Sequence, residues 1–135
     1  MEVSGGHAAF LDESPIHHGT VGASWLWNLS RRVSVGPEIV FMKGPGSDRD
    51  FFLTGKVVVD FMPSRIVSPY FVADGGVMLH RETFVRTGDF WAKEGAVSFG
   101  AGARIAVSPR FFFAPEFRLG WEPHFRVGAV VGWRM

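Results

Sequence analysis

Apolar and charged residues alternate along most of this chain with a period of two residues. Neighbouring side chains of an extended strand point to opposite faces, so this period predicts strands with one apolar and one polar face. The odd positions of these strands are almost all apolar, as along residues 51–61. The even positions hold ten charged residues, which are therefore expected on one surface of a sheet: Glu38, Lys56, Asp60, Asp74, Arg104, Glu116, Arg118, Glu122, Arg126 and Arg134.

Eight strand-like runs are separated by turn and loop residues. The predicted strands are 2–10, 19–28, 33–43, 51–62, 67–80, 94–107, 111–122 and 125–135. Short turns at 28–32, 63–66 and 108–110 alternate with connections at 12–18, 44–50, 81–93 and 123–124, of which only the last is short. This spacing predicts an antiparallel, up-and-down β-barrel that forms one domain over residues 1–135.

Three prolines lie early in predicted strands that follow short turns. Pro37, Pro69 and Pro115 each remove one donor from the strand ladder, and proline in a strand normally marks an edge or a bulge. Because a closed barrel has no edges, we predict β-bulges at these positions, near the rim that carries the short turns.

The size of the side chains decides which face of the barrel is inside. The interior of an eight-stranded barrel barely accommodates side chains. The even face offers many small residues, among them Gly22, Ser34 and Gly100, whereas the odd face is rich in Phe and Trp. The odd face is therefore expected to contact lipid, which favours a transmembrane barrel over a soluble ligand-binding barrel of the lipocalin type. Outward aromatic residues near the strand ends predict two membrane girdles: Trp25, Trp27, Phe61, Phe111 and Trp133 on the turn side, and Phe41, Phe51, Trp121 and Phe125 on the loop side.

The ten even-face charges comprise five acids and five bases. An unpaired buried charge costs several kcal/mol, whereas paired and hydrogen-bonded charges are tolerated. The balance therefore predicts an interior network of ion pairs that fills the lumen. The pair Glu116 and Arg118 belongs to this network on the same argument, and a structural salt bridge is favoured over a catalytic pair.

The composition excludes several classes of protein. A net charge of +1 gives no basic face for nucleic acid. The absence of cysteine excludes a disulfide scaffold and thiolate metal sites. No apolar run approaches the roughly 20 residues of a membrane helix. Strand-like sequence follows Met1 without a secretory signal, so the chain is expected to be a mature form.

The run Val127-Gly128-Ala129-Val130-Val131-Gly132-Trp133-Arg134-Met135 ends the chain with alternating apolar residues and a nearby aromatic. This tail, with the eight-strand pattern, resembles the small outer-membrane β-barrel family of the outer-membrane protein A and X type. Met135 stands where that family usually has Phe. The resemblance implies an outer-membrane location, insertion by the outer-membrane assembly machinery, contact with lipid or detergent, and a monomer.

Some members of that family remove or transfer acyl chains of lipid A with a His, a Ser and an acid near the extracellular rim. The candidates here are His17, His18, His80, His124, Ser14, Ser47, Asp48 and Asp89. None forms a recognisable motif, and a triad requires side chains within hydrogen-bonding reach of one another. A metal site at the adjacent His17 and His18 is not favoured, because neighbouring side chains of an extended chain diverge. The glycine-rich residues 100–104 lack the strand-turn-helix context of a phosphate loop.

We therefore expect no catalytic function and no cofactor. The favoured role is structural, or interaction at the cell surface. A general pore is not expected, since aqueous channels need about 16 strands. The alternatives are a lipid-modifying enzyme and, less favoured, the soluble ligand-binding barrel.

Overall fold

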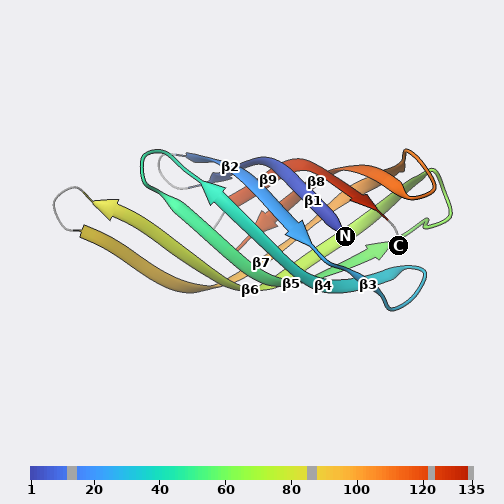
Figure 1. Ribbon diagram of the computed structural model, residues 1–135, viewed down its shortest axis with the longest axis horizontal. Helices are drawn as coiled ribbons and strands as arrows, with labels where there is room; N and C mark the ends of the chain where they lie inside the picture. Colours follow the sequence, from blue (N-terminus) through green and yellow to red (C-terminus); the bar gives the residue numbers. More distant parts are fainter. Residues whose placement is uncertain (12–14, 85–87, 122–123, 134–135) are drawn as a thin grey trace.

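Antiparallel strands close into a barrel in the computed structural model of the chain (Figure 1). The structure describes residues 1–11, 15–84, 88–121 and 124–133, with residues 82–84 and 88–90 described by their backbone alone. The strands are β1 (Glu2–Phe10), β2 (Ile16–Ser24), β3 (Trp27–Asn28), β4 (Val33–Lys43), β5 (Arg49–Asp60), β6 (Val67–Phe84), β7 (Gly88–Ala106), β8 (Phe111–Gly120) and β9 (His124–Trp133). No helix among the described residues has the length and apolar composition needed to cross a membrane.

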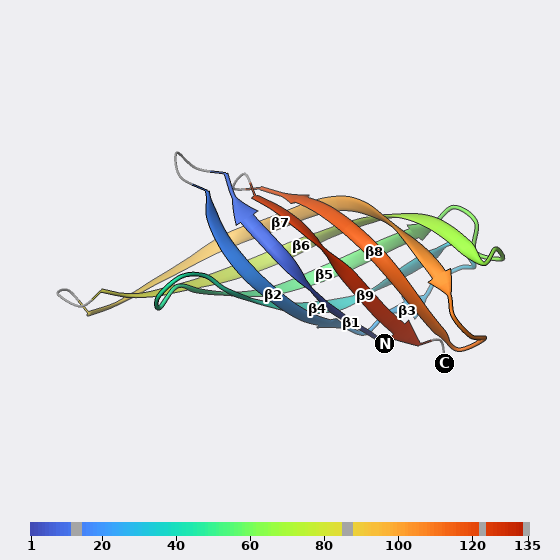
Figure 2. The ribbon, with the colours of Figure 1, turned by 90° about the horizontal axis from the view of Figure 1, so that it is seen from above.

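Pairing of the first strand with the last closes the sheet. β1 pairs with β9 from Glu2 opposite Gly132 to Phe10 opposite His124, and with β2 on its other side. β2 and β3 both pair with β4 and together form one interrupted strand, so the barrel has eight strands as predicted. Both ends of the chain lie at the end of the barrel that carries the short turns (Figures 1 and 2).

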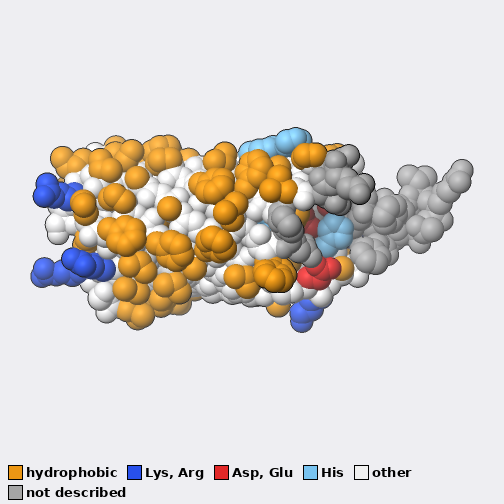
Figure 3. Space-filling model, turned by 180° about the vertical axis from the view of Figure 1, so that it is seen from behind, with side chains coloured by type: hydrophobic (Ala, Val, Ile, Leu, Met, Phe, Trp, Pro, Cys, Tyr) orange, Lys and Arg blue, Asp and Glu red, His pale blue; other side chains and the backbone are white. Residues whose placement is uncertain are grey.

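Side chains alternate between the lumen and the outer surface. Along β5, every even residue from Asp50 to Asp60 is buried, while Phe51, Leu53 and Val57 are exposed. The same alternation exposes large apolar side chains along the outer wall. On the face shown in Figure 3 they cover much of the barrel, and the Lys and Arg side chains lie near its ends. Odd charges such as Lys43, Arg49 and Lys93 also occur in strands, but they are exposed and lie at the loop end.

The predicted loop at 81–93 is wrong, because β6 and β7 continue through most of it. These strands have 18 and 19 residues, and Arg81 pairs with Trp91 in an unbroken ladder. The Arg81 guanidinium lies 4.9 Å from the centre of the Trp91 ring. Polar residues are accommodated because the two strands pair with each other beyond the barrel, where the hairpin projects from the loop end (Figure 1).

The predicted β-bulges are also wrong. Ser24 pairs with Glu38 and Trp27 with Val35, so the offset between the strands is the same on both sides of Pro37. Trp25 donates its backbone N–H to the Pro37 carbonyl at 3.1 Å. Proline cannot donate in return, and this missing donor interrupts the ladder between β2 and β3 without an extra residue. The β7–β8 register is likewise unchanged across Pro115.

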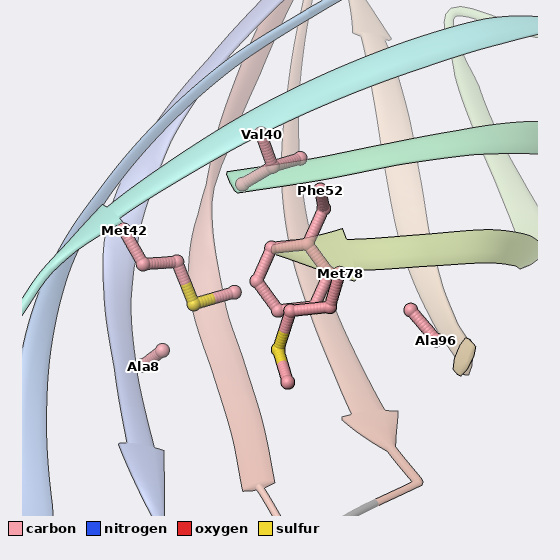
Figure 4. Packing of buried hydrophobic residues seen from close by; sticks show 6 residues of the cluster. All are labelled: Ala8, Val40, Met42, Phe52, Met78 and Ala96. Carbon is pink, nitrogen blue, oxygen red and sulfur yellow. The ribbon is translucent and has the colours of Figure 1, made fainter. Parts of the chain in front are cut away.

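Two apolar layers fill parts of the lumen that we expected to be polar. The loop-side layer consists of Ala8, Val40, Met42, Phe52, Met78 and Ala96, and its side chains converge inside the barrel (Figure 4). The turn-side layer consists of Val58, Tyr70, Val72, Phe112, Ala114 and Val130. Large even-position residues therefore do enter the lumen, where they pack against small neighbours such as Ala8 and Ala114.

Candidate functional site

Opposite charges form a continuous chain of contacts in the lumen. Arg104 donates to Asp60 through Nη1 and to Glu2 Oε1 through Nη2, the latter at 2.8 Å. Glu2 Oε2 lies 2.9 Å from Lys56 Nζ. Lys56, which is 2% exposed, also contacts Glu38 Oε1 at 3.0 Å. Each of these cations is thus shared between two carboxylates that come from different strands.

Arg118 is the hub of the other half of this chain. Its Nη1 and Nη2 donate to the two Glu38 oxygens at 2.6 and 3.0 Å, in the bidentate arrangement that suits arginine. Nη1 also lies 2.7 Å from Asp74 Oδ2, and Nε donates to Glu116 Oε1 at 2.7 Å. Arg126 Nη2 reaches Asp74 Oδ2 at 3.5 Å. We call these nine residues the lumen charge chain: Glu2, Glu38, Lys56, Asp60, Asp74, Arg104, Glu116, Arg118 and Arg126.

Strand register and small residues bring these long side chains together. Lys56 of β5 lies directly opposite Asp74 of β6. Tyr70 donates its hydroxyl to Glu116 Oε2 at 2.7 Å and lies against Gly102, where a Cβ would stand 2.5 Å from the ring. The Arg104 guanidinium lies 5.1 Å from the centre of the Tyr70 ring. Glycine at position 102 therefore provides the room that the Tyr70 to Glu116 contact requires.

Eight of the ten predicted network residues lie in the lumen charge chain, and Glu122 and Arg134 lie outside the described residues. Sequence reasoning missed Glu2, which accepts from Ser24, Lys56 and Arg104. Its even position was the available signal, but the residues after it in the first strand barely alternate. Tyr70, at another even position, was also missed.

Two histidines and two aspartates meet at the loop end of the lumen and form what we call the mouth cluster: His18, Asp48, Asp50 and His80. His18 Nε2 lies 2.8 Å from Asp48 Oδ2 and 3.5 Å from Asp50 Oδ2. His80 Nδ1 lies 2.6 Å from Asp50 Oδ1 and 3.7 Å from Asp48 Oδ1. His18 and Asp50 are each only 2% exposed.

The mouth cluster is held by three strands and one tight loop. His18 comes from β2, Asp50 from β5 and His80 from β6. Asp48 lies in the connection between β4 and β5, where Gly44 donates to the Asp48 carbonyl at 3.1 Å and Asp48 donates to the Pro45 carbonyl at 3.3 Å. These backbone hydrogen bonds hold the loop in shape without help from its side chains, and they place Asp48 next to His18.

The loop-side apolar layer lies between the mouth cluster and the lumen charge chain. On β5, Phe52 stands between Asp50 and Lys56, and on β6, Met78 stands between His80 and Asp74. Two charged regions of the same lumen are thus kept apart by packed side chains.

The predicted catalytic candidates divide into separate groups. The mouth cluster contains His18, His80 and Asp48. His17 points the other way, and its Nδ1 lies 3.0 Å from Nε2 of the exposed His7. The ring of His124 packs 4.8 Å from that of Phe10.

The other three candidates are serines and an acid. Ser47 lies in the tight loop. Ser14 and the side chain of Asp89 lie outside the described residues.

The predicted girdle residues divide by exposure. Trp25, Trp27, Phe41, Phe51, Phe61, Phe111 and Trp121 are exposed, whereas Phe125 and Trp133 are half-buried. Strand pairing sets Phe41 opposite Phe51 and Phe111 opposite Trp133. Their contact with a membrane interface stays a prediction.

No family model and no curated protein sequence matches this chain. Solved structures do match its fold. Neisserial surface protein A is similar with a TM-score of 0.80 and 12% identity, over 99% of this chain and 95% of that one. The N-terminal β-barrel domain of Pseudomonas aeruginosa OprF is similar with a TM-score of 0.65 and 14% identity, over 98% and 94% of the two chains.

The outer-membrane enzyme PagL is similar with a TM-score of 0.65 and 14% identity, over the full length of both chains. The class that these likenesses define is the small eight-stranded barrel of outer-membrane proteins, and this chain has that fold. Because one of the three is an enzyme, the shared fold leaves the activity of this chain to be argued from its own residues.

Proposed function

We propose that the protein is a bacterial outer-membrane β-barrel with a structural or surface-interaction role and no general pore. The observation that carries this proposal is a distribution of side chains that is inverted relative to a soluble protein, with ion pairs inside and an apolar wall outside. A soluble ligand-binding barrel would require the opposite distribution. Contact with lipid, insertion by the outer-membrane assembly machinery and a monomeric state belong to the same proposal.

The packing of the interior favours a barrel that does not conduct solutes freely. A cavity of about 560 Å³ opens at the turn end and is lined by Glu2, Asp60, Arg104 and Phe112 among others. Beyond it lie the shared contacts of Lys56 and Arg118, beside which the structure holds a pocket of about 30 Å³. We expect the lumen charge chain and the loop-side apolar layer to close the passage through the barrel.

The ends of the barrel suggest its orientation. The short turns carry the exposed residues Arg31, Arg32, Arg65 and Arg110, while the other end carries the longer connections and the projecting β6–β7 hairpin. Barrels of this class place short turns in the periplasm and longer loops outside the cell. We propose the same orientation, which puts the mouth cluster at the cell surface.

Folding into lipid vesicles tests the proposal. The folded protein is expected to migrate on gels differently before and after boiling, because a closed barrel pairs its backbone groups and resists SDS. A single gel position for both samples, or a monomer that stays soluble without detergent, would contradict it.

A lipid-modifying enzyme is the second candidate, because PagL has the same fold and the mouth cluster joins histidines to carboxylates. The test is release of acyl chains from lipid A by the purified protein, with His80→Gln, Ser47→Ala and Asp48→Asn as variants. Release that all three variants retain at the level of the unaltered protein would point to a contaminant, and release lost in any of them would favour the enzyme.

A further inference from the structure

We propose that the mouth cluster binds one divalent transition-metal ion of the zinc type, with His18 Nε2 and one oxygen each of Asp48 and Asp50 as its protein ligands. The ligand atoms of these three residues all lie within 4.8 Å of one another. Two ligands at about 2.0–2.2 Å from one ion stand roughly 3 Å apart, so the 2.8 and 3.5 Å separations from His18 Nε2 already suit an ion.

The hydrogen bonds of His18 leave a lone pair directed at two carboxylates. Both ring nitrogens face acceptors, because Nδ1 lies 3.3 Å from the Ile16 carbonyl and Nε2 lies 2.8 Å from Asp48 Oδ2. A neutral ring can donate to only one of them, and we assign its proton to Nδ1. In the neutral ring Nε2 then presents a lone pair, which faces the oxygens of Asp48 and Asp50. Lone pairs facing one another require a cation between them, either a second proton or a metal ion. A ring N–H bonded to a carbonyl is also the usual outer-shell contact of a metal-binding histidine.

The carboxylates support the same assignment. Among the described residues, none makes a hydrogen bond to the buried Asp48 Oδ1. His80 Nδ1 is 2.6 Å from Asp50 Oδ1, where it orients the carboxylate whose other oxygen faces His18. A nitrogen donor beside two carboxylates favours zinc, cobalt or nickel over calcium and magnesium, which prefer oxygen ligands.

Gly44 lies directly against the proposed ligand atoms. A Cβ at this position would stand 2.5 Å from both His18 Nε2 and Asp48 Oδ2. Only glycine lets the β4–β5 loop approach the ligands this closely, so a bound ion would fasten this loop to β2.

Metal titration of the barrel folded in detergent and stripped by a chelator tests the proposal. Co²⁺ is the spectroscopic probe, followed by competition with Zn²⁺. One ion per chain is expected to bind, with weakening of at least about tenfold in His18→Gln and in Asp48→Asn. His17→Gln is the matched control, because it removes the adjacent histidine on the outer face and is expected to bind as the unaltered protein does.

Absence of saturable binding would overturn the proposal, and so would binding lost in His17→Gln but kept in His18→Gln, which would place the ion on the outer pair with His7. The shift in gel migration on boiling is measured on every sample, so a failure of the barrel is distinguished from a failure of the metal site. If His18→Gln does not fold, Asp48→Asn decides, because Asp48 lies in a loop outside the strand ladder.

Discussion

The lumen charge chain and the mouth cluster satisfy their carboxylates in different ways. In the charge chain every acid contacts Arg or Lys, whose charge is permanent at neutral pH, as where Arg118 joins Glu38, Asp74 and Glu116. In the mouth cluster Asp48 and Asp50 contact histidines, which supply a positive charge only when protonated. Each carboxylate of the charge chain therefore contacts a permanent cation, although the chain has five acids and four bases. The mouth cluster gains positive charge only from a bound proton or a bound cation.

Removing the hub of the charge chain gives the largest expected effect. Arg118→Gln leaves the carboxylates of Glu38, Asp74 and Glu116, two of them buried, without their shared cation and is expected to lower the free energy of unfolding by about 3–5 kcal/mol. The matched control is Arg110→Gln in an exposed turn, with an expected change within about 0.5 kcal/mol. Urea unfolding in lipid vesicles measures both, and equal midpoints would show that the lumen charges are solvated.

A charge placed outside the barrel lacks the partners that the lumen provides. Val57 is 40% exposed on the outer wall beside the buried Val58. Val57→Arg is expected to cost about 2–4 kcal/mol near the middle of a bilayer. Val57→Leu is the control for size and is expected to change little. Unfolding in vesicles compares them, and an arginine as well tolerated as leucine would argue against lipid contact at this position.

The mouth cluster is expected to respond to metal where the charge chain does not. Zn²⁺ at 100 times its dissociation constant should raise the free energy of unfolding by about 2.7 kcal/mol. Asp48→Asn should lower this increase to about 1.4 kcal/mol or less, as a tenfold or greater weakening of binding requires, whereas His17→Gln should preserve it. Thermal or urea unfolding with and without Zn²⁺ provides the measurement. The same increase in Asp48→Asn as in the unaltered protein would show that the ion binds elsewhere.

The smallest expected effect is the coupling between the two regions. Because the loop-side apolar layer separates them, the effects of Asp48→Asn and Arg118→Gln should add to within about 0.5 kcal/mol. Glu38 and Arg118, which are in contact, should instead show an interaction energy of about 0.5–3 kcal/mol in a double-mutant cycle of their own. Strong coupling across the layer would mean that the two regions form one network.

The sequence alone was enough to predict the barrel and the lumen face of eight of the ten even-position charges, namely those that the structure describes. A period of two residues is a local property, so the even positions of Lys56 and Arg118 predicted their shared surface, and the size of the odd-face aromatics predicted that this surface is inside. The long β6–β7 hairpin was missed because its polar residues do not alternate in hydrophobicity, although they pair across the hairpin. The bulges were wrong because a missing proline donor interrupts a ladder without shifting its register.

Only the tertiary structure decided which charges meet. Glu2 and Lys56 are 54 residues apart, and Arg118 and Glu38 are 80 apart. In the mouth cluster, His18 contacts Asp48, which lies 30 residues later in the chain. Asp50 contacts His80 of the neighbouring strand. Alternation assigns a residue to a face but not to a height or a neighbour, because those follow from strand register and closure of the sheet. We expected His18 in the connection at 12–18, but β2 begins at Ile16 and includes it, and nothing in the sequence indicated that two carboxylates would meet the His18 ring in the lumen.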